Sequence, residues 1–322
     1  MAQVLLLVGD KLARVEAEIL GNLRSEFGPI DEAGHYIGQA GGKRIRPTLV
    51  LLTSGLLDYQ GTDDVLLGAV FEFIHTATLV HDDIIDEATT RRGRPSVNSV
   101  FGNHFTVLLG DYLYIRSMNM ALRARKIRLV DILAEATERM IEGEILGAHL
   151  RGRADVTRQQ HLAIVERKTA WLFSACCRSA GVLAGADPKT EEDMARYGMS
   201  LGIAFQLVDD LLDLSGDEAT VGKPVASDLR EGRLTLPWID LLERGSDEER
   251  NQVRAVLEDG AFSRATFTEL RAALERHGCI EATRRMAVEH AEIARAVVER
   301  FPPSPYKDVL IDLPATILSR DR

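Results

Sequence analysis

The stretch from Gly68 to Asp86 reads GAVFEFIHTATLVHDDIID, an apolar run that ends in a cluster of aspartates. On a helix, Asp82 and Asp86 are four residues apart and therefore project from the same face. Two like charges at this spacing repel each other, so they destabilise the helix unless a cation lies between them. Taken alone, such a cluster is more often a solvated helix end than a binding site.

A second stretch repeats the pattern: Met199 to Asp213 reads MSLGIAFQLVDDLLD, which gives Asp209 and Asp213 the same spacing. Carboxylates on helices apolar enough to be buried are costly unless they are paired or bind a metal. All-oxygen ligands without a nearby cysteine favour a hard cation such as magnesium, which completes its shell with water and substrate phosphates. Two such clusters therefore indicate a diphosphate held between them by metal ions.

The rest of the chain has helical spacing and few strand signals. No proline occurs from Ser96 through Asp187, which permits long uninterrupted helices. We predict one all-α domain over residues 1–322, with about ten or more helices and an amphipathic packing segment after about Ser246. The predicted breaks are Gly28-Pro29, Gly41-Gly42, Gly93 to Pro95, Asp187-Pro188, Gly222 to Pro224 and Pro302 to Pro305.

Composition narrows the class of protein. Apolar residues make up 45% and charged residues 27% of the chain, as in an ordinary globular protein. The net charge of −10 argues against nucleic acid as a partner. The three cysteines fit neither a disulfide framework nor a zinc site. The start of the chain has no signal-peptide pattern, and the uncharged stretch Pro47 to Leu57 is too short to span a bilayer. We therefore predict a cytoplasmic protein without a transmembrane segment.

Basic patches accompany the acidic clusters. The first is Gly41-Gly42-Lys43-Arg44-Ile45-Arg46-Pro47, at a predicted helix start where backbone amides favour anions. The second, Arg91-Arg92-Gly93-Arg94, is predicted to be a tight turn just after the first acidic cluster. Its arginines can hold phosphate oxygens or simply form salt bridges. His75, two helical turns before Asp82, is either a candidate substrate-binding residue or an ordinary core histidine.

Three further polar positions lie near the apolar runs. Lys168-Thr169 is inside an apolar stretch, so a buried Lys168 requires an anionic partner. Gln206 lies about one helical turn before Asp209. Lys223, between Gly222 and Pro224, is predicted to lie on a loop, where an ordinary surface lysine is the simpler interpretation.

Together these motifs resemble those of the trans-isoprenyl diphosphate synthases, also called polyprenyl synthetases. The resemblance runs from about Gly41 to Pro237 and includes Phe205-Gln206, Gly222-Lys223 and Thr235-Leu236-Pro237. It implies an all-α fold around a deep central cavity, a homodimer, and magnesium ions, three per active site. It also implies the head-to-tail condensation of isopentenyl diphosphate with an allylic diphosphate in trans.

The resemblance also implies roles for individual residues. Asp82, Asp86 and Asp209 would bind metal, with Asp213 as a further candidate at the same spacing, and Asp82, Asp86, Asp209 and Lys168 would be catalytic. The allylic diphosphate would be held by Arg91, Lys168, Thr169, Gln206 and Lys223. Isopentenyl diphosphate would be held by Lys43, Arg46, His75 and Arg92. Arg233, a further candidate for substrate binding, stands where the family commonly has lysine. The terminal Ser319-Arg320-Asp321-Arg322 lacks the basic tail of many short-chain members.

Product length is predicted from the helix that carries Asp82. One helical turn matches about one extended isoprene unit, so a growing tail would first meet Thr78, Ala77 and Ile74, and then Phe71. Ala77 is small where short-chain relatives commonly have a bulky aromatic residue. We therefore predict a hexaprenyl to decaprenyl product of the kind used for quinone side chains. A geranylgeranyl or farnesyl product is the alternative, and Ala77 can instead be small only to let helices pack.

Two rival functions remain open at this point. A terpene cyclase also ionises an allylic diphosphate, but it needs no second diphosphate site, which Lys43, Arg46 and His75 would supply here. A non-catalytic subunit of a partner synthase would be expected to lose acidic ligands. Both acidic clusters are intact in this chain.

Overall fold

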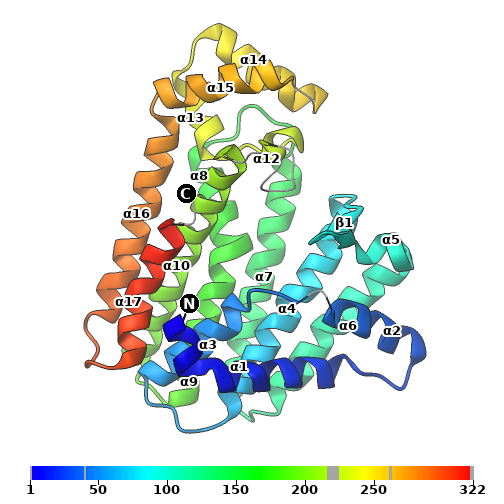
Figure 1. Ribbon diagram of the computed structural model, residues 1–322, viewed down its shortest axis with the longest axis vertical. Coiled ribbons are helices and arrows are strands. Elements are labelled where there is room, and N and C mark those ends of the chain that lie inside the picture. Colours follow the sequence, from blue (N-terminus) through cyan, green and yellow to red (C-terminus); the bar gives the residue numbers. More distant parts are fainter. Residues whose placement is uncertain (1, 40, 216–224, 261–262, 320–322) are drawn as a thin grey trace. The chain divides into compact units, whose positions relative to one another are not determined.

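The computed structural model describes residues 2–39, 41–215, 225–260 and 263–319, and helices dominate these segments (Figure 1). The chain divides into two compact units. Unit 1 comprises Met1–Thr137, Ala175–Ala195 and Pro302–Val309. Unit 2 comprises Glu138–Ser174, Arg196–Phe301 and Leu310–Arg322. The prediction of an all-α chain is confirmed, whereas the prediction of a single domain stays a prediction.

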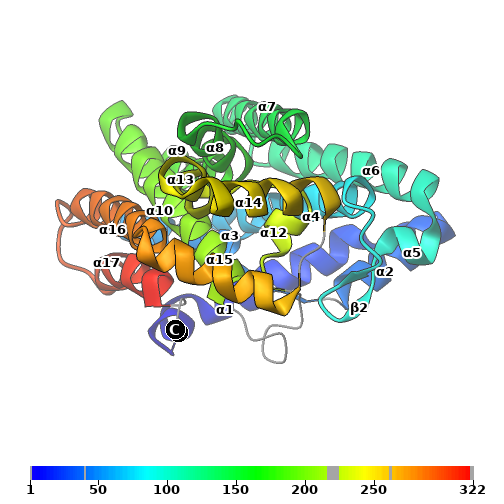
Figure 2. The same ribbon diagram turned by 90° about the horizontal axis from the view of Figure 1, so that it is seen from above.

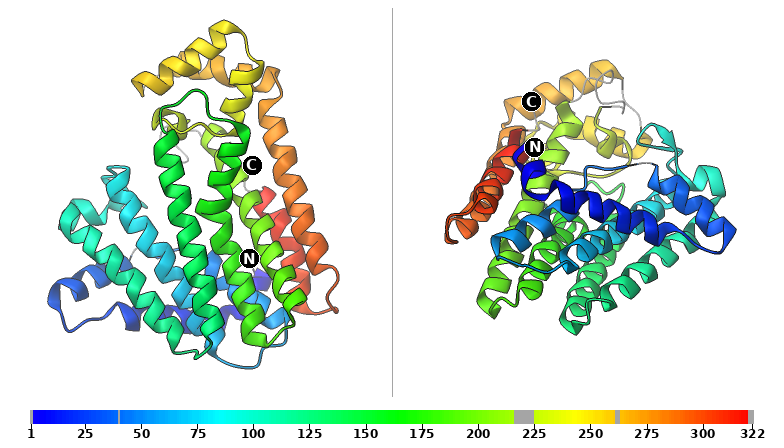
Figure 3. Two further views of the ribbon diagram at one scale, coloured as in Figure 1. Left: turned by 180° about the vertical axis from the view of Figure 1, so that it is seen from behind. Right: turned by 60° about the horizontal axis from the view of Figure 1, so that its bottom comes forward.

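Unit 1 is built around helix α4 (Asp63–Ile85), which packs against α1 (Ala2–Leu23), α3 (Ile45–Leu56) and α6 (Asn103–Leu122). Its closest packing is with α6, and the two helices run side by side in Figure 3. By length and composition α4 could cross a membrane, but 72% of its most apolar window is buried, as in the core helix of a globular unit. The buried side chains Phe71, Phe73 and Ile74 anchor this core.

A short hairpin follows α4. Its strands are β1 (Thr90–Arg91) and β2 (Arg94–Pro95), joined by Arg92 (φ 53°) and Gly93 (φ 73°). Two successive positive φ angles in a two-residue loop are typical of a type I′ turn. The predicted tight basic turn is therefore confirmed.

The hairpin packs against α2 (Gly28–Gly38), close to α5 (Val97–Phe101), as Figure 2 shows. The Tyr36 hydroxyl donates to the carbonyl oxygen of Pro95 at 2.6 Å, and the Arg94 guanidinium lies 4.6 Å from the centre of the Tyr36 ring. These contacts fix the position of the arginine-bearing turn relative to α2.

Unit 2 contains the remaining site helices: the end of α7 (Ile127–Leu150), α8 (Arg158–Val165), a π-helical turn η1 (Glu166–Ala170), the start of α9 (Trp171–Ala184) and most of α10 (Pro188–Ser215). Its C-terminal helices are α12 (Ser227–Arg230), α13 (Leu236–Arg244), α14 (Asp247–Asp259), α15 (Arg264–Arg276), α16 (Cys279–Val298) and the end of α17 (Pro305–Leu318). Trp238, Leu241, Val253 and Leu270 share one buried cluster, which confirms the predicted amphipathic packing helices.

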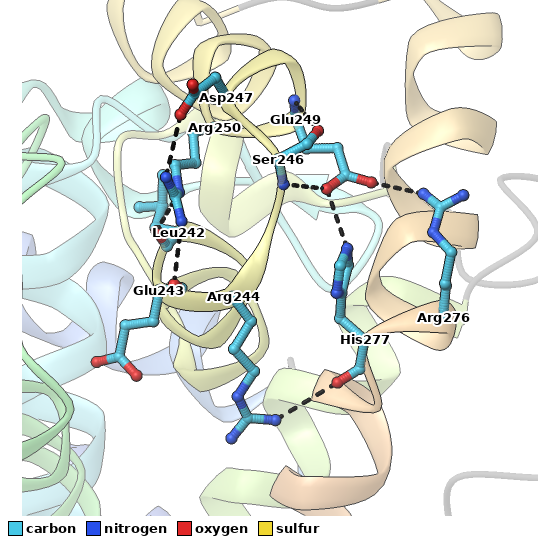
Figure 4. A network of polar contacts seen from close by, with 9 residues as sticks. All are labelled: Leu242, Glu243, Arg244, Ser246, Asp247, Glu249, Arg250, Arg276 and His277. Atoms are coloured by element: carbon cyan, nitrogen blue, oxygen red, sulfur yellow. Dashed lines mark hydrogen bonds and ion pairs between the residues drawn. The ribbon is translucent and has the colours of Figure 1, made fainter.

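A polar network ties α14 to the end of α15 (Figure 4). The Glu249 carboxylate accepts hydrogen bonds from the Ser246 backbone N–H at 2.6 Å, from Arg276 at 2.5 Å and from His277 Nε2 at 3.0 Å. The Ser246 amide, assisted by His277, lowers the pKa of Glu249 below its ordinary value. Ser246 and Glu249 form a capping box, so the same carboxylate starts α14 and joins it to the next helix.

The predicted breaks agree with the observed helix ends. Pro29, Pro188 and Pro305 each lie in the first turn of a helix, and α3 begins at Ile45, just after the Gly41-Gly42 loop. The proline-free stretch forms the long helices α6 and α7. The break at Gly222 to Pro224, and Lys223 with it, lies outside the described residues.

Candidate active site

The first acidic cluster closes α4. Asp82 is in the last helical turn and Asp86 is the C-cap, with its backbone N–H bonded to the Asp82 carbonyl at 2.8 Å. Both side chains are partly exposed, whereas Asp83 between them is 1% exposed. The negative end of the helix dipole adds to the repulsion between Asp82 and Asp86, so this helix end favours a bound cation.

Asp83 has a different environment. Arg91 Nε donates to its Oδ1 at 2.5 Å, which ties the hairpin to α4. Burial raises the pKa of Asp83, although the bond to Arg91 opposes the shift. Arg91, predicted to hold the allylic diphosphate, therefore already neutralises one carboxylate of the first cluster, and its Nη atoms are the part left to meet a ligand.

A pocket in unit 1, with about 80 Å³ of free volume, brings several predicted residues together. His75, Arg91 and Arg92 line it, and so do Gly41 and Arg44. Lys43 is exposed, and Lys43 and Arg46 are not among the lining residues, although the charge of Arg46 acts on His75. The glycine-led loop, the hairpin and His75 therefore line one pocket, while their roles toward a substrate stay predictions.

The glycines of the loop allow this meeting. Arg92 donates to the carbonyl oxygen of Gly41, which has φ +58°. A Cβ on Gly42 would lie 3.1 Å from both Arg44 Nη1 and Arg92 Nη1. The absence of side chains therefore lets two guanidinium groups approach the loop backbone.

The protonation states suit an anion-binding pocket. Burial lowers the pKa of His75 well below its ordinary value, and the charges of Arg46 and Arg92 add to this shift. The imidazole is therefore neutral at neutral pH and offers one N–H donor. Burial also lowers the pKa of Arg46, against the opposing effect of Glu72, but an arginine remains charged.

Arg44 is a pocket residue to which sequence reasoning gave no role. Its guanidinium bonds to both oxygens of Glu16, at 2.8 and 2.7 Å, and to Glu72 at 2.6 Å. Burial lowers the pKa of Arg44, but Glu16 and Glu72 outweigh it and raise the pKa above its ordinary value. A buried glutamate inside the apolar run of α4 was the available signal, because Glu72 requires a cation.

In unit 2, Lys168 and Thr169 lie on the π-helical turn η1, a geometry that is frequent at functional sites. Lys168 Nζ is 2.7 Å from Glu144 Oε1, although the lysine side chain is 40% exposed and so is not the buried lysine for which a partner was required. The Thr169 hydroxyl donates to Gln206 Oε1 at 2.8 Å. Three residues predicted to hold the allylic diphosphate therefore lie in one region of unit 2.

Gly143 of α7 sets how closely that helix approaches the π-helical turn. A Cβ at Gly143 would lie 2.8 Å from the Lys168 backbone nitrogen and 2.8 Å from Arg167 Cβ. We expect Gly143→Ala to displace η1, to cost about 1–3 kcal/mol of stability and to lower kcat/KM by about tenfold or more.

The matched control is Gly147→Ala, one turn along the same helix, where an added Cβ meets no atom within 4 Å. This change should leave activity intact and stabilise α7 by up to about 1 kcal/mol. Thermal unfolding and steady-state kinetics of both variants provide the measurement. Equal behaviour of the two variants would contradict a positioning role for the Gly143 contact.

The second acidic cluster lies at the end of α10. Asp209 is exposed, whereas Asp210 is buried and accepts hydrogen bonds from Gln206 Nε2 at 3.0 Å and from His161 Nε2 at 3.1 Å. As in the first cluster, the first aspartate is accessible and the second is bound into the protein.

Asp213 is held by protein groups rather than presented to a ligand. Its carboxylate accepts hydrogen bonds from the Ser227 hydroxyl at 2.6 Å and from the backbone N–H groups of Ser227 and Asp228 at 2.9 and 3.2 Å. Burial, together with the charge of Asp228, raises the pKa of Asp213 to about 6. Three of the roughly four lone-pair sites of this carboxylate therefore already accept donors at the start of α12, and the metal-binding role predicted for Asp213 stays a prediction.

Arg233 belongs to the same part of unit 2. Its guanidinium bonds to Asp228 at 2.8 Å and to Glu231 at 2.5 Å. The substrate-binding role predicted for Arg233 stays a prediction, but its two carboxylate partners give it a structural role around α12.

Within the described ranges, no three carboxylate, imidazole or thiol groups are gathered closely enough to form a ready-made metal site. Magnesium is usually bound by only one or two protein carboxylates, and substrate phosphates and water complete its shell. Asp82 and Asp86 supply two such carboxylates. The donor set of the first cluster therefore fits this cation.

The four residues predicted to set product length all lie on α4. Phe71, Ile74 and Ala77 are buried, and the Thr78 hydroxyl donates to the His75 carbonyl at 2.8 Å. Their helix packs mainly against α6, which includes Tyr112 to Leu122. The role of these residues in product length stays a prediction.

Comparison with known proteins assigns the family. The polyprenyl synthetase family profile matches residues 28–274. The chain is 38% identical over 316 residues to the octaprenyl diphosphate synthase of Escherichia coli K12, covering 98% of each chain. A crystal structure of a decaprenyl diphosphate synthase from Rhodobacter capsulatus superposes with a TM-score of 0.93 at 37% identity, covering 100% of this chain and 99% of the other.

A second solved structure matches equally well. It is a polyprenyl synthase from Caulobacter crescentus in complex with calcium and isoprenyl diphosphate, with a TM-score of 0.93 and 31% identity over 100% of this chain and 98% of the other. The sequence motifs, the helical fold and these full-length similarities agree. The chain therefore belongs to the polyprenyl synthetase family of trans-prenyltransferases.

Proposed function

We propose that this protein condenses isopentenyl diphosphate with an allylic diphosphate, head-to-tail, to form a hexaprenyl to decaprenyl diphosphate. The observation that carries the proposal is the end of α4, where an accessible acidic pair lies next to a pocket lined by Arg91, Arg92 and neutral His75. The condensation requires a site for a metal and a site for a phosphate. In this part of unit 1 the acidic pair can bind the metal and the cationic pocket can bind the phosphate. Incubation with both substrates and magnesium, followed by product sizing, tests it.

The metal is proposed to be magnesium, with three ions per active site, held by Asp82, Asp86 and Asp209. When bound, it supplies positive charge that stabilises the diphosphate leaving group. The complex of a matched Caulobacter protein with calcium and isoprenyl diphosphate supports a divalent cation at such a site. Asp213 is a further candidate, although its carboxylate also accepts hydrogen bonds from Ser227 and Asp228.

Basic and polar side chains of the protein are proposed to orient the two substrates. Lys43, Arg46, His75 and Arg92 are proposed to hold isopentenyl diphosphate. Arg91, Lys168, Gln206 and Lys223 are proposed to hold the allylic diphosphate, with Arg233 as a further candidate. Thr169 is proposed to belong to the same site through its hydrogen bond to Gln206. Their donors stabilise charge on the departing diphosphate, and apolar neighbours such as Leu79 and Val80 exclude water from the carbocation. The released diphosphate is proposed to take the final proton.

The two sites can be separated by kinetics. We expect Arg46→Ala to raise KM for isopentenyl diphosphate by about 10- to 100-fold with a much smaller effect on the allylic substrate. Lys168→Ala should do the reverse, because it removes a charge from the π-helical turn. Each substrate is titrated at saturation of the other. Equal changes for both substrates in either variant would show that the two sites are misassigned.

We also propose a cytoplasmic homodimer without a transmembrane segment and with no nucleic acid as a partner. Helix α6 leaves Val107, Leu108, Ile115 and Leu122 exposed, and apolar residues at this spacing form one face of a helix. A second copy of the chain is the proposed partner of this face. The net charge of −10 supports the absence of nucleic acid.

The product length rests on Ala77 and on the matched proteins. Those proteins include an octaprenyl and a decaprenyl diphosphate synthase, and shorter products such as geranylgeranyl or farnesyl diphosphate are the alternative. A terpene cyclase is not favoured, because the cationic pocket beside α4 would then have no second diphosphate to bind. A non-catalytic subunit is not favoured either, because Asp82, Asp86 and Asp209 are all present.

A further inference from the structure

We propose that His161 and Asp210 are positioning residues that fix the amide of Gln206, so that this amide, rather than the Thr169 hydroxyl, donates to the allylic diphosphate. The inference rests on the proposed function, and it deepens the assignment of the allylic site. All four residues belong to unit 2, on α8, η1 and α10.

The first step concerns Asp210, whose side chain is only 3% exposed. A buried carboxylate is costly unless hydrogen-bond donors satisfy it. His161 Nε2 lies 3.1 Å from Asp210 Oδ2, and Gln206 Nε2 lies 3.0 Å from Asp210 Oδ1. Each oxygen of Asp210 therefore has one partner from a different side chain.

The second step follows from which groups can donate. An ionised carboxylate only accepts, so both partners must donate to it. His161 consequently carries a hydrogen on Nε2, and the amide nitrogen of Gln206 must point toward Asp210. The carbonyl oxygen Oε1 of Gln206 then points away from Asp210 and accepts the Thr169 hydroxyl at 2.8 Å. Donation therefore converges on Asp210, from His161 on one side and from Thr169 through Gln206 on the other.

The third step counts the remaining hydrogens. A hydroxyl has one hydrogen, and Thr169 gives it to Gln206, so Thr169 can offer only lone pairs to an anion. The Gln206 amide nitrogen has two hydrogens, and Asp210 takes one of them. The second is the donor that the network leaves to a diphosphate oxygen. His161, 6% exposed, keeps this orientation by holding Asp210 from the far side.

The alternative is that His161 only joins α8 to α10 and affects stability alone. His161→Leu removes the donor, whereas His161→Gln keeps a side-chain N–H. We expect His161→Leu to raise KM for farnesyl diphosphate, used as the allylic probe, by about 10- to 100-fold. KM for isopentenyl diphosphate should stay within about twofold, and His161→Gln should recover most of the loss. Should His161→Leu not fold, His161→Asn, with an amide too short to reach Asp210, takes its place.

A double-mutant cycle with Thr169→Val tests the shared mechanism. Thr169→Val removes the hydroxyl with little change in volume, and both changes release the same Gln206 amide. The effects on allylic KM should therefore be strongly non-additive, with the double variant within about threefold of the worse single variant. Losses that multiply, an equal rise in both KM values, or an unchanged allylic KM in a folded His161→Leu enzyme would each overturn the inference.

Lys168→Ala is measured in the same assay and separates the two levels of the argument. If Lys168→Ala leaves the allylic KM unchanged, the proposed allylic site itself is wrong. If it raises the allylic KM while His161→Leu does not, only the positioning role of His161 is rejected.

Discussion

Asp82→Asn is expected to lower kcat by about three to four orders of magnitude while leaving the helical fold intact. The change removes the charge of a proposed metal ligand but keeps the size of the side chain. A bound cation contributes several kcal/mol to leaving-group stabilisation, and about 1.4 kcal/mol corresponds to a tenfold change in rate. Asp82 is partly exposed at the end of α4, so a side chain of the same size can replace it without a packing defect.

The measurement is single-turnover condensation over a magnesium titration, with circular dichroism to verify the fold. Asp131→Asn is the matched control, because Asp131 is an exposed aspartate on α7 and outside the proposed site. It should keep full activity. An Asp82→Asn enzyme with normal kcat and an unchanged magnesium requirement would contradict the metal assignment.

Ala77→Phe is expected to shorten the main product to about farnesyl diphosphate while preserving the first condensation. Ala77 lies in the buried part of α4, roughly one to two turns before Asp82, and one turn spans about 5.4 Å. A phenyl ring at this level would close the path of a growing tail after about one addition to a geranyl primer. Product sizing with a labelled isopentenyl diphosphate provides the measurement.

Because Ala77 is 3% exposed, a phenyl ring can also overpack the interface around α4, at a cost of about 1–3 kcal/mol. Ala77→Leu is therefore included as a smaller obstruction and should give products of intermediate length. Ala134→Phe, at an exposed alanine of α7, controls for added hydrophobic surface. An unchanged product ladder in a folded and active Ala77→Phe enzyme would show that Ala77 does not line the path and is small only for helix packing.

Much of the local structure was predictable because it depends on neighbours in sequence. The spacing of Asp82 and Asp86 placed both carboxylates on one face of a helix, and the basic Arg91 to Arg94 segment was predicted as a tight turn. Lys168 was expected to need an anionic partner only if buried; its side chain is 40% exposed, and it pairs with Glu144 all the same. Helical periodicity and turn chemistry act over a few residues, so one sequence is enough to read them.

Other features of the site depend on residues distant in sequence. Equal spacing made Asp213 look like Asp86, but Ser227 and Asp228 take up its carboxylate. Arg44 looked like any other cation of its patch, but Glu16 and Glu72 hold it at the pocket. Gly143 carried no signal of its close approach to the π-helical turn.

The sequence by itself determined the helical class, the family and the positions of the two acidic clusters, because these are properties of periodicity and order along the chain. The tertiary structure decided which member of each cluster is accessible and which is bound into the protein. Adjacent helical residues point about 100° apart, so only one of Asp209 and Asp210 can face the packed interior. Periodicity alone does not say which one, and the packing of α8 and η1 against α10 gives the interior side to Asp210, with His161 and Gln206 as its partners.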